Sequence, residues 1–171
     1  ERRHYSLILT QDSKLMRSQQ LIATYFHAVK DRCASGNTFR VRVDSPQLSG
    51  IIKKLYEEEE LPLMTMYAAH ALHAQHAFTV NYVFGIPGED RYIILFIEMD
   101  EGELFPSFAA TYMEFAGYEA EIATMFGIIP DGHPLLRSTA LHPNWPEGLY
   151  PLRKDFAWDT RPAMLDKFTH P

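Results

Sequence analysis

Apolar residues recur at a spacing near 3.6 in two early segments, residues 13–33 and residues 44–58, and this spacing predicts two helices. Ser13 and Asp44 are placed to cap their N-termini, and Gly36 follows the first helix as a stop signal. Both helices present one apolar stripe, so each is expected to pack on a common core.

Strict alternation of apolar and polar residues over residues 38–43 predicts a half-buried strand between these helices. Residues 5–10 and 63–67 are shorter candidates for strands. The strongest local pattern is a pair of segments, 78–86 and 91–99, joined by Pro87-Gly88-Glu89-Asp90, which predicts an antiparallel hairpin. The second segment is apolar on both faces and is therefore expected inside the sheet, covered on both sides.

A third helix is predicted over residues 108–126, capped by Ser107 and stopped by Gly127. Composition changes at Pro130, because 7 of the 11 prolines lie in residues 130–171, where they exclude a long helix or a central strand. The expected fold is α+β, a mixed or antiparallel sheet with helices packed on it. Residues 1–129 would form this domain and residues 130–171 an extended, proline-rich tail that docks on a partner.

The composition excludes several classes of function. The chain has 171 residues, a hydrophobic fraction of 46% and a net charge of −6, which suit one globular domain with no general attraction to nucleic acid. No apolar run approaches the roughly 20 residues that span a bilayer. The single cysteine, Cys33, cannot hold an iron–sulfur cluster alone. Because glycine-rich nucleotide motifs are also absent, no redox cofactor is expected in this chain.

Two clusters of polar residues offer alternative chemistry. His70, His73 and His76 could together hold zinc, although a polar turn or an exposed face explains them more simply. Glu114 and Glu121 lie seven residues apart on one face of the predicted helix, so they could serve a hydrolase together with a histidine. No nucleophile or oxyanion loop accompanies them.

The tail carries aromatic residues and arginine without any period, namely Trp145, Tyr150, Phe156 and Trp158 beside Arg153. Aromatic and arginine side chains are enriched where proteins bind one another. Proline lowers the conformational entropy that such a segment loses on docking. The tail therefore resembles an interface anchor more than a freely solvated chain.

Three motifs in succession carry a resemblance. Glu119-Ala-Glu-Ile-Ala-Thr-Met-Phe-Gly127 is followed by Gly132-His-Pro-Leu-Leu-Arg137 and then by Trp145-Pro-Glu-Gly-Leu-Tyr-Pro-Leu-Arg-Lys-Asp155. They resemble the 30 kDa subunit family of respiratory complex I, an NADH dehydrogenase, and this family includes the related domain of membrane-bound hydrogenases and formate hydrogenlyase. Ala120, Thr124 and Ser138 depart from charged positions of the family pattern.

The resemblance implies a non-catalytic subunit of a membrane-associated oxidoreductase, held peripherally on the cytoplasmic side of the cell membrane. It would dock on the large, hydrogenase-like subunit, near the quinone or nickel–iron site, beside small iron–sulfur subunits. Iron–sulfur clusters, FMN and quinone or nickel–iron would then belong to other subunits. The residues that match the motifs, and that would contact the partner, are Glu119, Glu121, Phe126, Gly127, His133, Arg137, Trp145, Arg153, Lys154 and Asp155.

Overall fold

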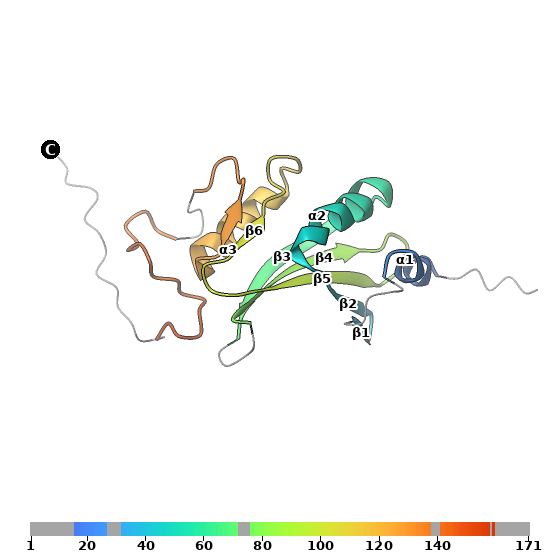
Figure 1. Ribbon diagram of the computed structural model, residues 1–171, viewed down its shortest axis with the longest axis horizontal. Coiled ribbons are helices and arrows are strands. Elements are labelled where there is room, and N and C mark those ends of the chain that lie inside the picture. The colour runs from blue at the N-terminus through green and yellow to red at the C-terminus, as the bar shows by residue number, and fades with distance from the viewer. Residues whose placement is uncertain (1–15, 27–31, 72–75, 138–140, 158, 160–171) are drawn as a thin grey trace, which may run out of the picture.

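A computed structural model describes residues 16–26, 32–71, 76–137, 141–157 and 159. Five strands form one mixed sheet in the order β1-β2-β5-β4-β3 (Figure 1). Their bounds are β1 Arg32–Ser35, β2 Thr38–Arg42, β3 Leu63–His70, β4 Phe78–Gly85 and β5 Tyr92–Met99. Strands β2 and β5 run parallel, and the other neighbours are antiparallel.

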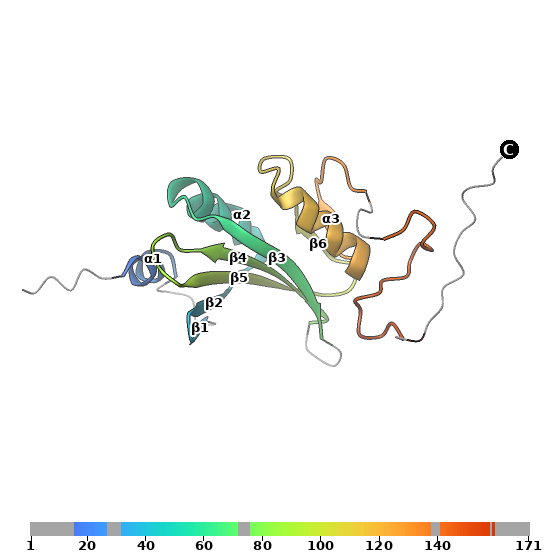
Figure 2. The ribbon, with the colours of Figure 1, turned by 180° about the vertical axis from the view of Figure 1, so that it is seen from behind.

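Two helices lie over the same side of the sheet, as both views show (Figures 1 and 2). Helix α2, Ser45–Lys53, continues as a π-helical turn, Lys54–Glu58, and helix α3 spans Phe115–Phe126. The short helix α1, Arg17–Tyr25, lies at the far end of the sheet. The α+β fold with a mixed sheet and packed helices is confirmed.

The core lies between α2, α3 and one face of the sheet. Alternate residues of β4 and β5 point into it, because successive side chains of a strand face opposite ways. Among them Tyr82, Phe84 and Leu95 are completely buried, and Leu48 and Ile52 of α2 meet them from above. Burying side chains of this size contributes about 1.5–3 kcal/mol each.

Hairpin β4–β5 is confirmed at nearly its predicted limits, and β5 does lie inside the sheet. Its second face, however, is only half-buried, so the prediction that both faces are covered is wrong. On that face the Arg40 guanidinium lies 4.2 Å from the Phe96 ring centre and donates a 3.1 Å hydrogen bond to the Asn81 side chain. The Arg40 side chain, which comes from β2 of the same sheet, thus covers part of the second face of β5.

The first helix differs from its prediction. It begins at Arg17 and ends at Tyr25, and residues 32–35 form strand β1 instead of a helical end. Gly36, with φ +58°, lies in the turn that joins β1 to β2. The predicted cap Ser13 and the candidate strand 5–10 lie outside the described residues.

Helix α3 begins seven residues later than predicted. Residues 108–114 form turns, in which the Phe108 carbonyl accepts hydrogen bonds from the N–H groups of Thr111 and Tyr112. Phe108 thereby turns inward, with its ring centre 6.0 Å from that of Tyr82. Ser107 does not cap the helix. Strand β6, Leu104–Pro106, ends directly before Ser107. It pairs in parallel with β7, Ile129–Asp131, which follows α3.

Candidate functional site

The glutamates of helix α3 face opposite ways. Glu119 is completely buried, whereas Glu121 is exposed. The Glu119 carboxylate accepts a 2.5 Å hydrogen bond from the Ser107 hydroxyl and a 2.7 Å bond from the Phe108 N–H. Glu119 is therefore inaccessible to a partner, and its position does not suit the predicted contact. It holds the turn before α3 against the helix.

Burial raises the pKa of Glu119, although the hydrogen bonds from Ser107 and Phe108 and the nearby His133 act in the opposite direction. The same buried region raises the pKa of Tyr82 well above its ordinary value, mainly through burial and secondarily through the Glu119 charge. Among the residues that the structure describes, the buried Tyr82 hydroxyl has no hydrogen-bond partner. Burial in this part of the core thus opposes the charged form of both side chains.

The C-terminus of α3 forms a platform for the tail. Gly127 stops the helix as predicted, with φ +71° and its N–H bonded to the Ala123 carbonyl. The Tyr150 ring lies against Gly127 so closely that a Cβ at this glycine would overlap it. The Leu152 N–H donates a 3.2 Å bond to the Met125 carbonyl. The tail thus crosses directly over the last turn of α3.

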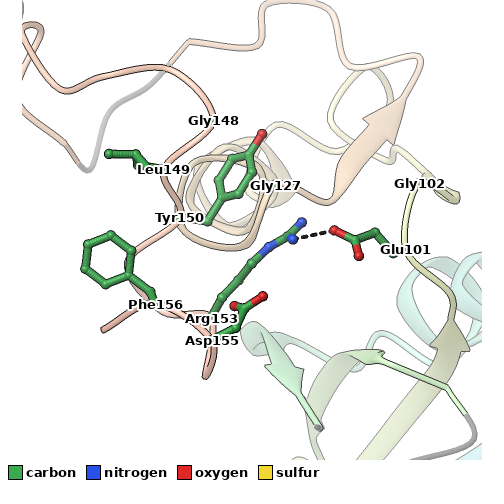
Figure 3. Close-up of a pocket in the computed structure, with 9 residues that line it drawn as sticks. All are labelled: Glu101, Gly102, Gly127, Gly148, Leu149, Tyr150, Arg153, Asp155 and Phe156. Atoms are coloured by element: carbon green, nitrogen blue, oxygen red, sulfur yellow. Dashed lines mark hydrogen bonds and ion pairs between the residues drawn. The ribbon is translucent and has the colours of Figure 1, made fainter. Parts of the chain in front are cut away.

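Arg153 holds the tail against the end of α3. Its Nε donates a 2.6 Å hydrogen bond to the Phe126 carbonyl, one of the carbonyls that a helix end leaves free. Its Nη1 donates a 2.5 Å bond to Glu101 (Figure 3). The guanidinium carbon lies 4.6 Å from the ring centre of Tyr150 and 5.0 Å from that of Phe78. Cation–π contacts of this kind contribute about 0.5–2 kcal/mol each.

His70 provides a second attachment for the tail. It ends strand β3, is buried, and stacks on Phe78 with 4.6 Å between ring centres. Its Nδ1 accepts a 3.1 Å hydrogen bond from the Lys154 N–H and lies 3.8 Å from an Asp155 oxygen. The prediction of a polar turn or exposed face is wrong for this histidine, because β3 extends to His70 and turns it toward the core.

The remaining motif residues lie nearer the surface. The His133 Nε2 is 3.3 Å from the Ala116 carbonyl of α3, and its Nδ1 accepts the Leu135 N–H. Arg137 is exposed. The Trp145 indole N–H donates a 2.8 Å bond to the Leu149 carbonyl and so closes a loop of the tail.

The predicted residues at the tail attachment fall into two groups. Phe126, Gly127 and Arg153 hold the tail on its own domain, although the sequence suggested that this segment depends on another polypeptide. Lys154 and Asp155 expose their side chains beside that attachment. No periodic pattern marks His70 or Glu101 as tail contacts, because they lie 84 and 52 residues from their partners along the chain.

The described residues of the two alternative clusters do not come together. His73 lies outside the described residues, and His76 faces Asp100, with 3.1 Å between Nδ1 and Oδ1. Within the described chain, no three metal-binding side chains gather. Glu114 and Glu121 are both exposed, and neither lines the pockets of the tail region.

A pocket of about 510 Å³ surrounds the Arg153 attachment (Figure 3). Glu101 and Asp155 contribute carboxylates to it, and Gly127, Tyr150 and Phe156 form other walls. The Arg153 guanidinium already binds Glu101 and the Phe126 carbonyl within this pocket. The pocket therefore lies along the contact between the tail and the domain, which we call the seam.

We expect Arg153→Ala to loosen the tail specifically. The variant loses two charge-assisted hydrogen bonds and two ring contacts of a mostly buried side chain, so docking of residues 150–156 should weaken by about 2 kcal/mol. Hydrogen exchange at the Leu152 and Lys154 amides, whose N–H groups are bonded to the domain, should accelerate about 30-fold. Lys154→Ala, a neighbour whose side chain is exposed, is the matched control and should leave both amides protected.

Residues 41–162 match the family described as respiratory-chain NADH dehydrogenase, 30 Kd subunit. The C/D subunit of NADH-quinone oxidoreductase from Proteus mirabilis is 38% identical over 94 residues, which are 53% of this chain and 15% of that protein. Hydrogenase-4 component G of Escherichia coli is 31% identical over 113 residues, 63% of this chain and 20% of that protein. Formate hydrogenlyase subunit 5 of Escherichia coli is 29% identical over 126 residues, 72% of this chain and 22% of that protein.

Solved structures share the fold. A chain of the membrane-bound sulfane sulfur reductase, an archaeal respiratory membrane complex, aligns with a TM-score of 0.68 at 16% identity, covering 82% of this chain and 84% of that one. The trypsin-resistant fragment of Nqo5 aligns with a TM-score of 0.53 at 17% identity, covering 60% of this chain and 86% of that one. With the family match extending over most of its length, the chain belongs to the respiratory-chain NADH dehydrogenase 30 Kd subunit family.

Proposed function

We propose that the chain is a structural, non-catalytic subunit of a membrane-associated oxidoreductase and docks on a large, hydrogenase-like subunit near its quinone or nickel–iron site. Family membership supports the assignment to such an assembly. The relatives' names cover both NADH–quinone oxidoreductase and hydrogenase complexes, so either assembly remains a candidate. Because this chain spans only 15–22% of these relatives, their whole-protein activities belong to the proposal.

Two observations carry the docking role: the tail is anchored on α3, and three leucines in residues 135–152 are exposed. Leu152 is 52% exposed between residues that are fastened to α3, and Leu135 is 61% and Leu136 40% exposed after the His133 contact. Exposed leucines on a fixed backbone lose little conformational entropy when a partner covers them. Lys154 and Asp155 would add polar contacts at the rim of that interface.

In this assignment the redox centres lie in other subunits. Iron–sulfur clusters, FMN and quinone or nickel–iron would belong to the large and the small iron–sulfur partners, and the complex would hold this chain on the cytoplasmic side of the membrane. Across the described residues, no helix combines the length and the apolar character that a membrane crossing requires.

Co-expression with a tagged large hydrogenase-like subunit tests the docking. Leu152→Glu and the double variant Leu135→Glu/Leu136→Glu should each lower the recovery of this chain at least tenfold, because each places a charge in the centre of the interface. The matched control is Met16→Glu, a 41% exposed apolar residue at the start of α1, at the opposite end of the molecule from the tail (Figure 1).

Undiminished recovery of both leucine variants would contradict the proposed surface. Capture by an NADH–quinone oxidoreductase subunit but not by a hydrogenase subunit, or the reverse, would identify the assembly.

A further inference from the structure

A second pocket, of about 410 Å³, shares Gly148, Leu149 and Tyr150 with the seam around Arg153. The tail forms most of its wall, and Thr124 of α3 contributes from the domain. Its other lining residues are Leu141, His142, Pro143, Trp145, Pro146 and Glu147. A pocket of this size accommodates a single large side chain.

Hydrogen bonds within the tail form this pocket before any partner binds. The Trp145 backbone N–H donates a 2.8 Å bond to the His142 carbonyl, and its indole N–H donates to the Leu149 carbonyl. The Asn144 N–H donates a 3.2 Å bond to the His142 ring. Tyr150 in turn is fixed by Gly127 and by the Arg153 guanidinium. The walls therefore have little freedom left to lose on binding.

The chemistry of the lining is apolar and aromatic with one negative charge. Trp145 and Tyr150 supply rings, and prolines and leucines supply aliphatic surface. Among the described residues that line the pocket there is no lysine or arginine. Glu147, an exposed carboxylate, is its acidic residue. Aromatic rings beside carboxylates attract a cation carried on an aliphatic stem.

We propose that this pocket receives an arginine or lysine side chain of the large partner subunit, an inference that rests on the proposed function. The stem of the side chain packs against Trp145 and the prolines, and its cation lies beside the Glu147 carboxylate. An acidic side chain would be repelled by that carboxylate. An uncharged aliphatic side chain would fill the volume without using the charge.

Binding of small probes to the full chain tests the pocket without any partner. The probes are the N-acetyl methylamides of arginine, norleucine and glutamate, and the readout is the Trp145 indole N–H resonance in proton–nitrogen spectra. For a ligand of this size we expect the arginine probe to bind with a Kd of about 1 mM and at least fivefold more tightly than norleucine. The glutamate probe should not shift the resonance.

Variants locate the charge and the ring. Glu147→Gln should weaken binding of the arginine probe about three- to fivefold while leaving norleucine unchanged, as expected for one exposed carboxylate. Trp145→Phe keeps an apolar ring in place and should weaken it less than Trp145→Ala, with the Tyr150 ring signals then serving as the readout. Glu58→Gln, which removes an exposed carboxylate from the end of α2's π-helical turn, is the matched control.

Equal affinity for norleucine and arginine, no effect of Glu147→Gln, or no binding of any probe would overturn the assignment. Failure of the pocket is distinguishable from failure of the proposed function. If the large partner still captures the wild-type chain while the probes fail, only the pocket assignment is lost. If the probes bind as expected while no large partner captures the chain, the docking role is wrong.

Discussion

Glu119→Ala is expected to lower the free energy of unfolding by about 3 kcal/mol. The substitution removes a completely buried carboxylate that accepts hydrogen bonds from the Ser107 hydroxyl and the Phe108 N–H. Each donor is then left without its partner, which costs about 1–3 kcal/mol, and a cavity forms between α3 and the turn before it. Equilibrium denaturation by urea measures the loss.

Glu121→Ala is the matched control, since this exposed glutamate lies two residues along the same helix and should change stability by less than about 0.5 kcal/mol. Equal effects of the two substitutions would contradict the structural role of Glu119.

Glu119→Gln tests the charge separately from the shape. Burial raises the pKa of Glu119 above its ordinary value of 4.5, so the folded chain holds this proton more tightly than the unfolded chain does. The resulting stabilisation is fully present below pH 4.5 and is lost as the pH rises through the raised pKa. The glutamine variant does not titrate at this position. Its stability relative to wild type should therefore increase between pH 4.5 and neutrality; a constant difference would contradict the shift.

Gly127→Ala is expected to destabilise the protein by about 3 kcal/mol and to release the tail. The left-handed φ of +71° costs any other residue about 1–2 kcal/mol. The new methyl group would also overlap the Tyr150 ring, which forces the ring and the tail to move. Urea denaturation gives the overall loss, and limited proteolysis between residues 141 and 157 reports the tail.

A double-mutant cycle with Tyr150→Ala separates these two causes. Removing the ring abolishes the clash but leaves the backbone strain, so the double variant should be more stable than the sum of the single effects predicts, by about 1 kcal/mol. Gly117→Ala is the matched control, because it lies within α3 with open space at its Cβ and should stabilise the protein by about 0.5–1 kcal/mol. Additive effects in the cycle would mean that Tyr150 does not rest on Gly127.

Elements with strong local signals were predictable from the sequence. The β4–β5 hairpin combines two runs of β-forming residues with a turn of Pro and Gly, and the contacts that stabilise it lie close in sequence. The end of α3 at Gly127 was predictable for the same reason, because the glycine signal acts on its own turn.

The start of α3 was not predictable, because long-range contacts override the local preference there. Residues 108–114 carry a helical pattern, but the Glu119 carboxylate takes the Phe108 N–H and Phe108 packs on Tyr82. The turn therefore gains two buried contacts that a straight continuation of the helix would not make. A pattern of apolar residues reflects only neighbours along the chain. It therefore predicted a helix that begins at Phe108.

The attachment of the tail to its own domain could not be predicted from the sequence for a related reason. Prolines and scattered aromatic residues indicated an interface, and the structure places part of that interface within the chain itself. Arg153 binds the Phe126 carbonyl of α3 and the Phe78 ring of β4, and these two partners lie far from it in the sequence and meet only in the folded chain. The exposed leucines beside it follow from this attachment and carry no periodic signal of their own.

The parallel pairing of β2 with β5 also constrains the order in which the polypeptide can assemble. Strand β2 ends at Arg42 but finds its inner neighbour only at Tyr92–Met99, after α2, β3 and β4 have been made. Pairing β2 with β5 requires a long loop to close, and the entropy lost in that closure makes the step slow. The β4–β5 hairpin closes over a short turn and can form faster. One edge of β2 therefore stays without its native partner until the central strand Tyr92–Met99 has been synthesised, and an unpaired strand edge of this kind is a site where other chains can add.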